Sequence, residues 1–306
     1  MNVTELTAFF NEVIKKDSNI SPAVAAIKTL LEYIRLQSFS TVVELRESVI
    51  NAIDVLTRTD SSAISVRSGC EMLLRFITLT ALDAGLDSGM EKCKEILLKN
   101  GQVFLSKASK ARSRIARVAC PWIPSGSNIL VHSKSRVVLE ILKEACVKNG
   151  TFHVYVCESS PDNSGLSMME ELNKLGIKVT LILDAAVGAV MEKVDFVLLG
   201  AEAVVESGGI INKIGTSTIG LCAKMLNKPV YVAVESFKFV RFYPLNNRDI
   251  PNEFKYKYST ISSVKDLENE HPLIDYTQPS LLTLLFTDIG IFTPSAVSDE
   301  LVKLYL

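Results

Sequence analysis

The segment from residue 206 to 216 carries a dense set of residue types suited to binding an anion. It reads Glu206-Ser-Gly-Gly-Ile-Ile-Asn-Lys-Ile-Gly-Thr216 and leads into a predicted helix. Adjacent glycines let the backbone approach a ligand, while Asn212 and Lys213 supply hydrogen-bond donors. Thr216 is placed to cap the helix, whose first N–H groups favour an anion. The segment predicts a phosphate site, with a tight crossover loop as the structural alternative; it lacks the GxxxxGK[ST] and GxGxxG patterns.

A second candidate anion position reads His132-Ser133-Lys134-Ser135-Arg136 and follows a predicted strand. Ser135 and Arg136 open a helix, which favours anion binding; the alternative is an N-cap serine beside an exposed arginine. His132 has a side chain suited to general acid or base work, or is simply hydrogen-bonded in place. Ser133 has no evident activating partner, so no hydrolase triad is predicted.

Two carboxylates follow later predicted strands. Asp184 comes after residues 179–183, and Glu202 belongs to Gly200-Ala201-Glu202. If the two strands are adjacent, repulsion between the carboxylates raises the pKa of one of them, and that group can then act as a general acid or base. Capping or salt bridging is the alternative.

The composition argues against metal, nucleic-acid and membrane chemistry. The six cysteines form no CxxC pair, and three histidines do not complete a metal set, so we expect free thiols in a reducing cytosol. The 33 Lys+Arg and 34 Asp+Glu leave no basic excess for nucleic acid or anionic lipid. The apolar stretches 179–191 and 281–292 each contain an aspartate, and the N-terminus lacks the pattern of a signal peptide.

A basic run lies on a predicted helix before these sites. The run has two interpretations, a solvated helix face or a docking face for an acidic partner. Its residues are Lys107, Lys110, Arg112, Arg114 and Arg117.

Two halves of different composition must position these residues. Residues 1–120 are poor in glycine and proline, and Ser21 and Pro22 introduce apolar residues at helical spacing. Thr41-Val-Val-Glu44 is typical of a capping box, and further helices are predicted over 69–82 and 91–118. The first half is therefore predicted to be an all-helical domain.

Residues 121–306 alternate between short, branched apolar runs and helical runs. The alternation predicts a parallel doubly wound sheet with its ligand crevice at the carboxyl ends of the strands. The fold class is thus α/β, with a helical domain (1–120) followed by a parallel-sheet domain (121–306). The predicted strands are 128–132, 152–157, 179–183, 196–200 and 229–234; the helices are 135–148, 166–175, 185–193 and 216–227.

The motif Asn-Lys-Ile-Gly-Thr (Asn212–Thr216), preceded by Gly-Ala-Glu, resembles the signature of a known superfamily. It contains methylthioribose-1-phosphate and ribose-1,5-bisphosphate isomerases and the alpha, beta and delta subunits of translation initiation factor 2B. The resemblance covers essentially the whole chain and implies a Rossmann-like second domain that forms a homodimer. The segments that resemble the alpha branch are Ser21–Leu31, Val204–Thr216, Glu235–Arg241 and Thr293–Leu306.

The resemblance implies a regulatory subunit of the cytosolic guanine nucleotide exchange factor for initiation factor 2. The dimer would join two sets of beta, gamma, delta and epsilon subunits into a decamer, with exchange catalysed by another subunit. It would also help sense initiation factor 2 phosphorylated on its alpha subunit. By the same resemblance, the contacts to that partner are expected at Thr41, Arg75 and Tyr305.

The enzyme branch of the superfamily uses a cysteine acid and an aspartate base, whose positions here hold Ser133 and Glu202. Serine is a far weaker acid, and glutamate displaces the carboxylate by one methylene. We therefore expect no catalysis and no cofactor beyond a bound sugar phosphate. An active aldose-phosphate to ketose-phosphate isomerase and a free-standing sugar-phosphate sensor are the alternatives. The expected pocket comprises His132, Ser133, Ser135, Arg136, Asp184, Glu202, Asn212, Lys213 and Thr216.

Overall fold

The computed structural model describes residues 2–17, 20–59, 63–83, 90–251 and 272–305. The chain divides into two compact units, Met1–Lys110 and Ala111–Leu306. The division falls inside helix α5 (Met90–Ala119) rather than at the expected boundary of 120/121, because Ile115, Ala116 and Ala119 pack in the core of the second unit. Within the described ranges, every helix is too short or too polar to cross a bilayer.

The first unit packs amphipathic helices around one apolar core. Phe10, Leu30, Leu45 and Leu97 are fully buried there because each lies on the apolar stripe of its helix. Besides the first part of α5, its described helices are α1 (Val3–Lys16), α2 (Pro22–Leu36), α3 (Val42–Thr57) and α4 (Ala63–Asp83).

Local sequence signals set two of the helix starts. Ser21 accepts from the backbone N–H of Val24 at 3.2 Å at the start of α2, as predicted. Thr41 likewise caps α3 by accepting from the N–H of Glu44 at 3.1 Å. The predicted capping box is only half formed, since the Glu44 carboxylate accepts from the N–H of Ser40 at 2.7 Å instead of that of Thr41.

The second unit is built on a seven-stranded sheet with the order β11-β10-β7-β4-β1-β2-β3. All pairs are parallel except β10 with β11. The order reverses between β1 and β4, the position where doubly wound sheets bind ligands. The five predicted strands are confirmed. The strands are β1 (Asn128–His132), β2 (His153–Cys157), β3 (Lys178–Ile182), β4 (Phe196–Gly200), β7 (Val230–Ala233), β10 (Leu284–Phe286) and β11 (Ile291–Phe292).

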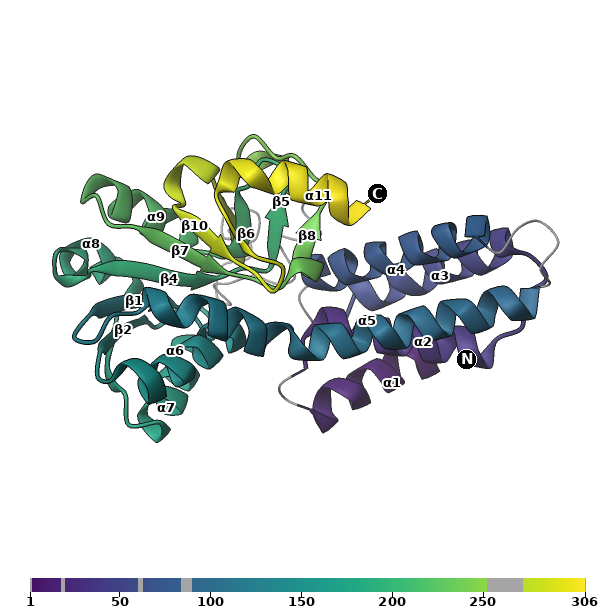
Figure 1. Ribbon diagram of the computed structural model, residues 1–306, viewed down its shortest axis with the longest axis horizontal. Coiled ribbons are helices and arrows are strands. Elements are labelled where there is room, and N and C mark those ends of the chain that lie inside the picture. Colours follow the sequence, from purple (N-terminus) through teal and green to yellow (C-terminus); the bar gives the residue numbers. More distant parts are fainter. Residues whose placement is uncertain (1, 18–19, 60–62, 84–89, 252–271, 306) are drawn as a thin grey trace, which may run out of the picture. The chain divides into compact units, whose positions relative to one another are not determined.

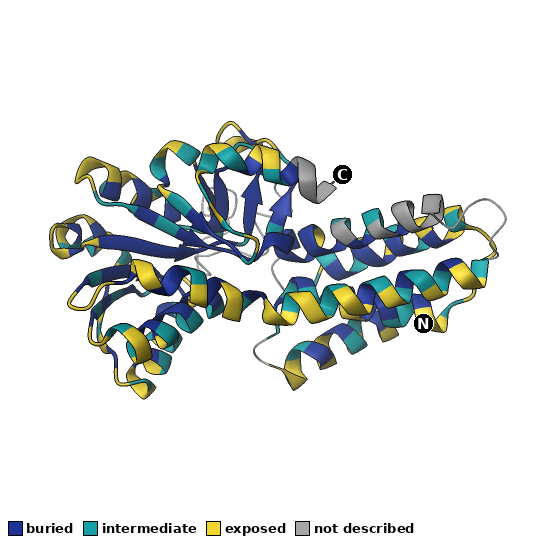
Figure 2. Cartoon of the chain, in the orientation of Figure 1, coloured by how far each residue is buried: buried dark blue, intermediate teal, exposed yellow. Residues whose placement is uncertain are grey.

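Helices cover both faces of this sheet, so its central strand β4 is buried throughout (Figure 2). Alternate residues of β1 enter different cores: Ile129 packs with α6 (Arg136–Asn149) and α7 (Ser164–Lys174), and Leu130 packs with α9 (Thr216–Met225). In Figure 1, α6 and α7 lie beside β1 and β2. The opposite core also includes residues of α8 (Val187–Val190) and α11 (Val297–Tyr305). The helix expected over 185–193 is shorter, because 3-10 turns flank α8.

A second, four-stranded sheet was not predicted. Its order is β8-β5-β6-β9, and β5 and β6 form an antiparallel hairpin across Gly208 and Gly209. Gly208 has φ +82°, and a side chain there would collide with Pro294. These glycines therefore serve a turn and tight packing, not the ligand approach that the sequence suggested. The strands are β5 (Ala203–Val205), β6 (Ile210–Lys213), β8 (Phe239–Val240) and β9 (Ile274–Thr277).

Replacing Gly165 with alanine should destabilise the second unit by about 3 kcal/mol. A Cβ at Gly165 would overlap the backbone carbonyl of Cys157, so α7 would have to move away from β2. Thermal unfolding followed by the fluorescence of Trp122, the chain's one tryptophan, checks this because Trp122 packs on Tyr231 and Phe286 of the same unit.

Gly188→Ala is the matched control, because a Cβ there has nothing within 4 Å. Alanine also favours helix over glycine, so stability should be unchanged or higher by up to about 1 kcal/mol. Equal melting temperatures for the two variants would contradict the assigned role of Gly165.

Candidate functional site

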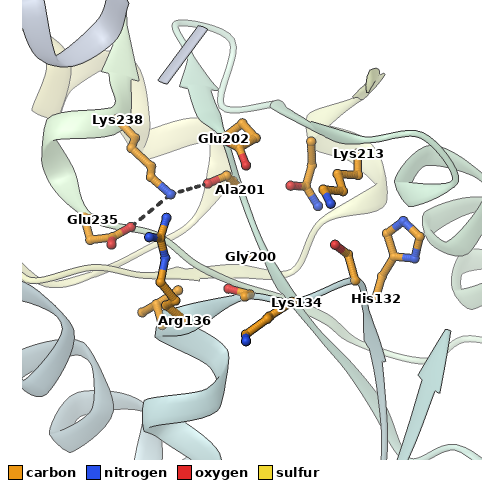
Figure 3. A pocket seen from close by; sticks show the side chains of 13 residues that line it. His132, Lys134, Arg136, Gly200, Ala201, Glu202, Lys213, Glu235 and Lys238 are labelled. Carbon is orange, nitrogen blue, oxygen red and sulfur yellow. Dashed lines mark hydrogen bonds and ion pairs between the residues drawn. The ribbon is translucent and has the colours of Figure 1, made fainter. Parts of the chain in front are cut away.

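A cleft open to solvent lies at the carboxyl ends of β1, β4 and β7 (Figure 3). It is at the reversal of strand order, the position where doubly wound sheets bind ligands. Its polar lining comes from three strand ends, the start of α6 and the end of β6. The lining residues are His132, Ser133, Lys134, Ser135, Arg136, Val137, Gly200, Ala201, Glu202, Asn212, Lys213, Glu235 and Lys238.

Most residues predicted for the pocket meet in this cleft. Asp184 and Thr216 do not line it, and instead support its walls. Thr216 is fully buried, accepts from the Asn212 amide at 3.1 Å and donates to the Lys213 carbonyl at 2.6 Å. The predicted residues that do line the cleft are His132, Ser133, Ser135, Arg136, Glu202, Asn212 and Lys213.

The start of α6 provides the cleft with an anion-binding end. Ser135 caps the helix, with its hydroxyl 3.4 Å from the N–H of Val138. Arg136 is half-buried in the cleft rather than exposed, and Lys134 donates to the Ser167 hydroxyl at 2.9 Å. A Cβ on Gly200 would collide with Ser135, so only glycine lets β4 approach this helix end. Helix N–H groups and nearby cations together favour phosphate.

A buried ion-pair cluster forms one wall, and the sequence analysis missed it. Glu235 is 2% exposed and accepts from Arg112 Nε at 3.0 Å, with Lys238 Nζ 3.2 Å away. Lys238 also donates to the Ala201 carbonyl at 2.8 Å. Burial raises the pKa of Glu235, but Lys238 and Arg112 outweigh it and lower that pKa to about 2. Of the basic run, Arg112 is therefore a structural partner, whereas Lys107, Lys110, Arg114 and Arg117 are exposed.

The start of α9 is not open to a ligand in the way the sequence suggested. The Asp275 carboxylate of β9 accepts from the N–H groups of Gly215 at 2.9 Å and Ser217 at 3.0 Å. Asp275, not Thr216, thus caps α9, and an internal carboxylate occupies the place predicted for phosphate. Burial raises the pKa of Asp275 to about 7, against the lowering effect of these N–H groups.

The carboxylate pair expected from Asp184 and Glu202 does not form, because β1 and β2 separate β3 from β4. Asp184 instead accepts from the N–H groups of Ser159 at 3.0 Å and Ser160 at 2.7 Å. It also faces His132, with Oδ1 4.0 Å from Nδ1.

His132 is fixed by its surroundings. Burial lowers its pKa, and since a carbonyl only accepts, Nε2 donates to the Ile214 carbonyl at 2.9 Å. Nδ1 then carries the lone pair and faces Asp184 rather than the cleft. Among described residues, His132, Cys157 and Asp184 place three possible metal-ligand atoms within 4.8 Å of one another. Burial raises the pKa of Cys157 to about 12, which keeps this thiol protonated at neutral pH and disfavours metal binding.

The opposite end of the cleft centres on Lys213. Its ammonium forms an ion pair with Asp162 and donates to the Ser164 hydroxyl at 3.0 Å. Ser164 also lies 2.7 Å from the hydroxyl of Ser133, whose φ is +61°. Asp162 and Ser164 were not predicted, because they follow β2 and reach Lys213 only through the fold.

The three residues expected to contact a phosphorylated partner are spread over the sequence. Thr41 is exposed and caps α3, and Arg75 is half-buried on α4. Tyr305 lies at the end of α11, and its side chain is outside the described part of the chain.

Comparison with known proteins shows which family this chain belongs to. Residues 15–294 match the family model described as the initiation factor 2 subunit family. The chain belongs to that family. It is 42% identical to "Translation initiation factor eIF2B subunit alpha" of Dictyostelium discoideum, with 98% of this chain and 96% of the relative covered.

More distant similarities fit the same family. "Ribose 1,5-bisphosphate isomerase" of Methanocaldococcus jannaschii is 28% identical, with 88% of this chain and 85% of the relative covered. The solved tetrameric eIF2B-beta2-delta2 complex from C. thermophilum matches with a TM-score of 0.77 at 18% identity, covering 100% of this chain and 96% of that chain, which supports the fold. The similarity to an alpha subunit supports a regulatory role within eIF2B.

Glu235→Gln should make the second unit less stable at neutral pH by about 3 kcal/mol, since it leaves buried cations without their carboxylate. The pKa of Glu235 falls from 4.5 to about 2 on folding, so its contribution is complete above pH 4.5 and is lost between pH 4.5 and 2. The difference in melting temperature between pH 7 and pH 3 should therefore be smaller for Glu235→Gln than for wild type. Glu171→Gln, on the surface of α7, is the control, and an equal pH dependence for wild type and Glu235→Gln would contradict this assignment.

Proposed function

We propose that this chain is the alpha-type regulatory subunit of an eIF2B exchange complex and that its cleft binds a sugar phosphate without converting it. The observation that carries the binding is the grouping of Arg136, Lys134 and the α6 N-terminus at one end of a polar cleft. The 42% identity to an eIF2B alpha subunit over nearly the whole chain supports the complex. The chain is proposed to pair with a second copy, join beta, delta, gamma and epsilon subunits in a cytosolic decamer, and contact the alpha subunit of initiation factor 2.

The absence of turnover is argued from the groups near the reacting end of a sugar. Ser133 carries a hydroxyl at the position where the resemblance to the isomerases implies a cysteine, and its Oγ is hydrogen-bonded to Ser164. His132 commits Nε2 to a backbone carbonyl and directs Nδ1 at Asp184. Neither is set to donate a proton to a ligand in the cleft. The phosphate-binding groups need no such acid, so binding survives without catalysis.

Sensing of the phosphorylated partner is proposed for the helical unit. Arg75 on α4 has a guanidinium suited to bidentate contacts with carboxylates or carbonyls. Thr41 at the exposed start of α3 is proposed as a second contact in this unit, and Tyr305 of α11 as a separate contact in the other unit.

Wild-type protein should bind ribose 5-phosphate in calorimetry, and Arg136→Ala should weaken that binding roughly tenfold or more, because a charge-assisted hydrogen bond is lost. Arg114→Ala, which removes an exposed arginine outside the cleft, should bind like wild type. No heat with the wild type at millimolar ligand would refute the sugar-phosphate site. Isomerisation of an added sugar phosphate would favour the enzyme alternative.

Arg75→Ala should leave basal nucleotide release from initiation factor 2 intact and weaken inhibition by its phosphorylated form several-fold. The assay uses exchange complexes reconstituted with and without this chain, and particle mass is followed in parallel. Arg46→Ala, an exposed arginine on α3, is the matched control. Equal inhibition of the Arg75 and Arg46 variants would remove Arg75 from the contact, and failure of the chain to join the complex would refute the subunit role.

A further inference from the structure

The two ends of the cleft differ in charge. At the α6 end, Arg112 and Lys238 both pair with the buried carboxylate of Glu235. Lys134 and Arg136 add further positive charge beside the helix N-terminus. Figure 3 shows Arg136, Glu235 and Lys238 gathered on one side, with His132 and Lys213 on the other. An anionic group is therefore stabilised more strongly at the α6 end than at the Lys213 end.

At the Lys213 end, a carboxylate already matches the cation. Asp162 pairs with Lys213, and its Oδ1 accepts from the N–H of Ser164 at 3.0 Å. Although burial raises the pKa of Asp162, the contacts with Lys213 and Ser164 lower it below its usual value, so the carboxylate is charged at neutral pH. The N–H groups of α9 nearby are occupied by Asp275. This end therefore offers hydroxyls and a neutralised lysine rather than net positive charge.

We propose that Asp162 is a specificity residue that makes the cleft select singly phosphorylated sugars over doubly phosphorylated ones. The phosphate lies at the α6 end, and the uncharged end of the sugar lies toward Lys213, Ser133 and Ser164. A second phosphate there would have to compete with Asp162 for Lys213 and would be repelled by the carboxylate. This inference rests on the proposed sugar-phosphate site and adds the class and orientation of the ligand.

The hydrogen-bonding groups at the Lys213 end suit a polyol. The hydroxyls of Ser133 and Ser164 each donate and accept, and the Lys213 ammonium only donates. Sugar hydroxyls match both roles, whereas a phosphate dianion only accepts. Asp162 thus selects by charge, and the two serine hydroxyls pair with sugar hydroxyls in either direction.

The test measures dissociation constants for ribose 5-phosphate and ribose 1,5-bisphosphate by calorimetry with the full chain. Wild type should bind the monophosphate at least tenfold more tightly than the bisphosphate. Asp162→Asn keeps the side-chain shape, removes the charge and frees Lys213, so it should shift that ratio toward the bisphosphate by tenfold or more. Glu171→Gln removes one carboxylate from α7, the helix that follows Asp162, at a position outside the cleft lining, and should leave the ratio unchanged.

The outcomes separate this inference from the proposed function. If wild type binds a sugar phosphate but Asp162→Asn leaves the ratio unchanged, the specificity role is overturned and the binding site stands. If wild type and Asp162→Asn bind neither ligand, the binding site itself is refuted. Asp162→Ser serves as a second variant should the asparagine variant fail to fold, and the same shift in the ratio is expected from it.

Discussion

The buried carboxylate of Glu235 is the interaction on which the cleft depends. It joins Arg112 near the end of α5 to Lys238 after β7, and Lys238 in turn binds the Ala201 carbonyl at the end of β4. A buried charge without a partner costs several kcal/mol, so these three segments are constrained to meet. The same contacts that fix this wall of the cleft also bring two cations to it. In the proposed function, the structure of the wall and its preference for anions therefore have one origin.

Internal carboxylates decide which of the cleft's positive features remain for a ligand. Two helices, α6 and α9, begin at this edge of the protein, and both starts attract anions. Asp275 satisfies the N–H groups at the start of α9, and Asp162 neutralises Lys213. The start of α6 is capped by the neutral hydroxyl of Ser135 instead. A neutral cap satisfies one N–H without cancelling the dipole, so a phosphate is best placed at α6.

The sequence predicted the elements whose signals are local. Branched apolar runs gave the strands of the parallel sheet, and Ser21 and Ser135 marked the starts of α2 and α6. The second sheet was missed because its strands are two to four residues long and pair across distant parts of the chain. The site shows the same difference between local and long-range signals. Site residues within a sequence motif were predicted, but the pairs Arg112–Glu235 and Asp162–Lys213 were not, because their members meet only through the tertiary structure.

The wrong pairing of Asp184 with Glu202 shows why a ligand site is easier to predict than a catalytic one. Phosphate binding needs helix N–H groups and cations near one sheet edge, and the order of strands and helices ensures that much. Proton transfer needs particular atoms within hydrogen-bond reach, which depends on which strands are neighbours. Here β1 and β2 lie between the two carboxylates. In the proposed function, a change at one acid position therefore ends catalysis while the cleft, the sheet edge and the α6 end still bind the sugar phosphate.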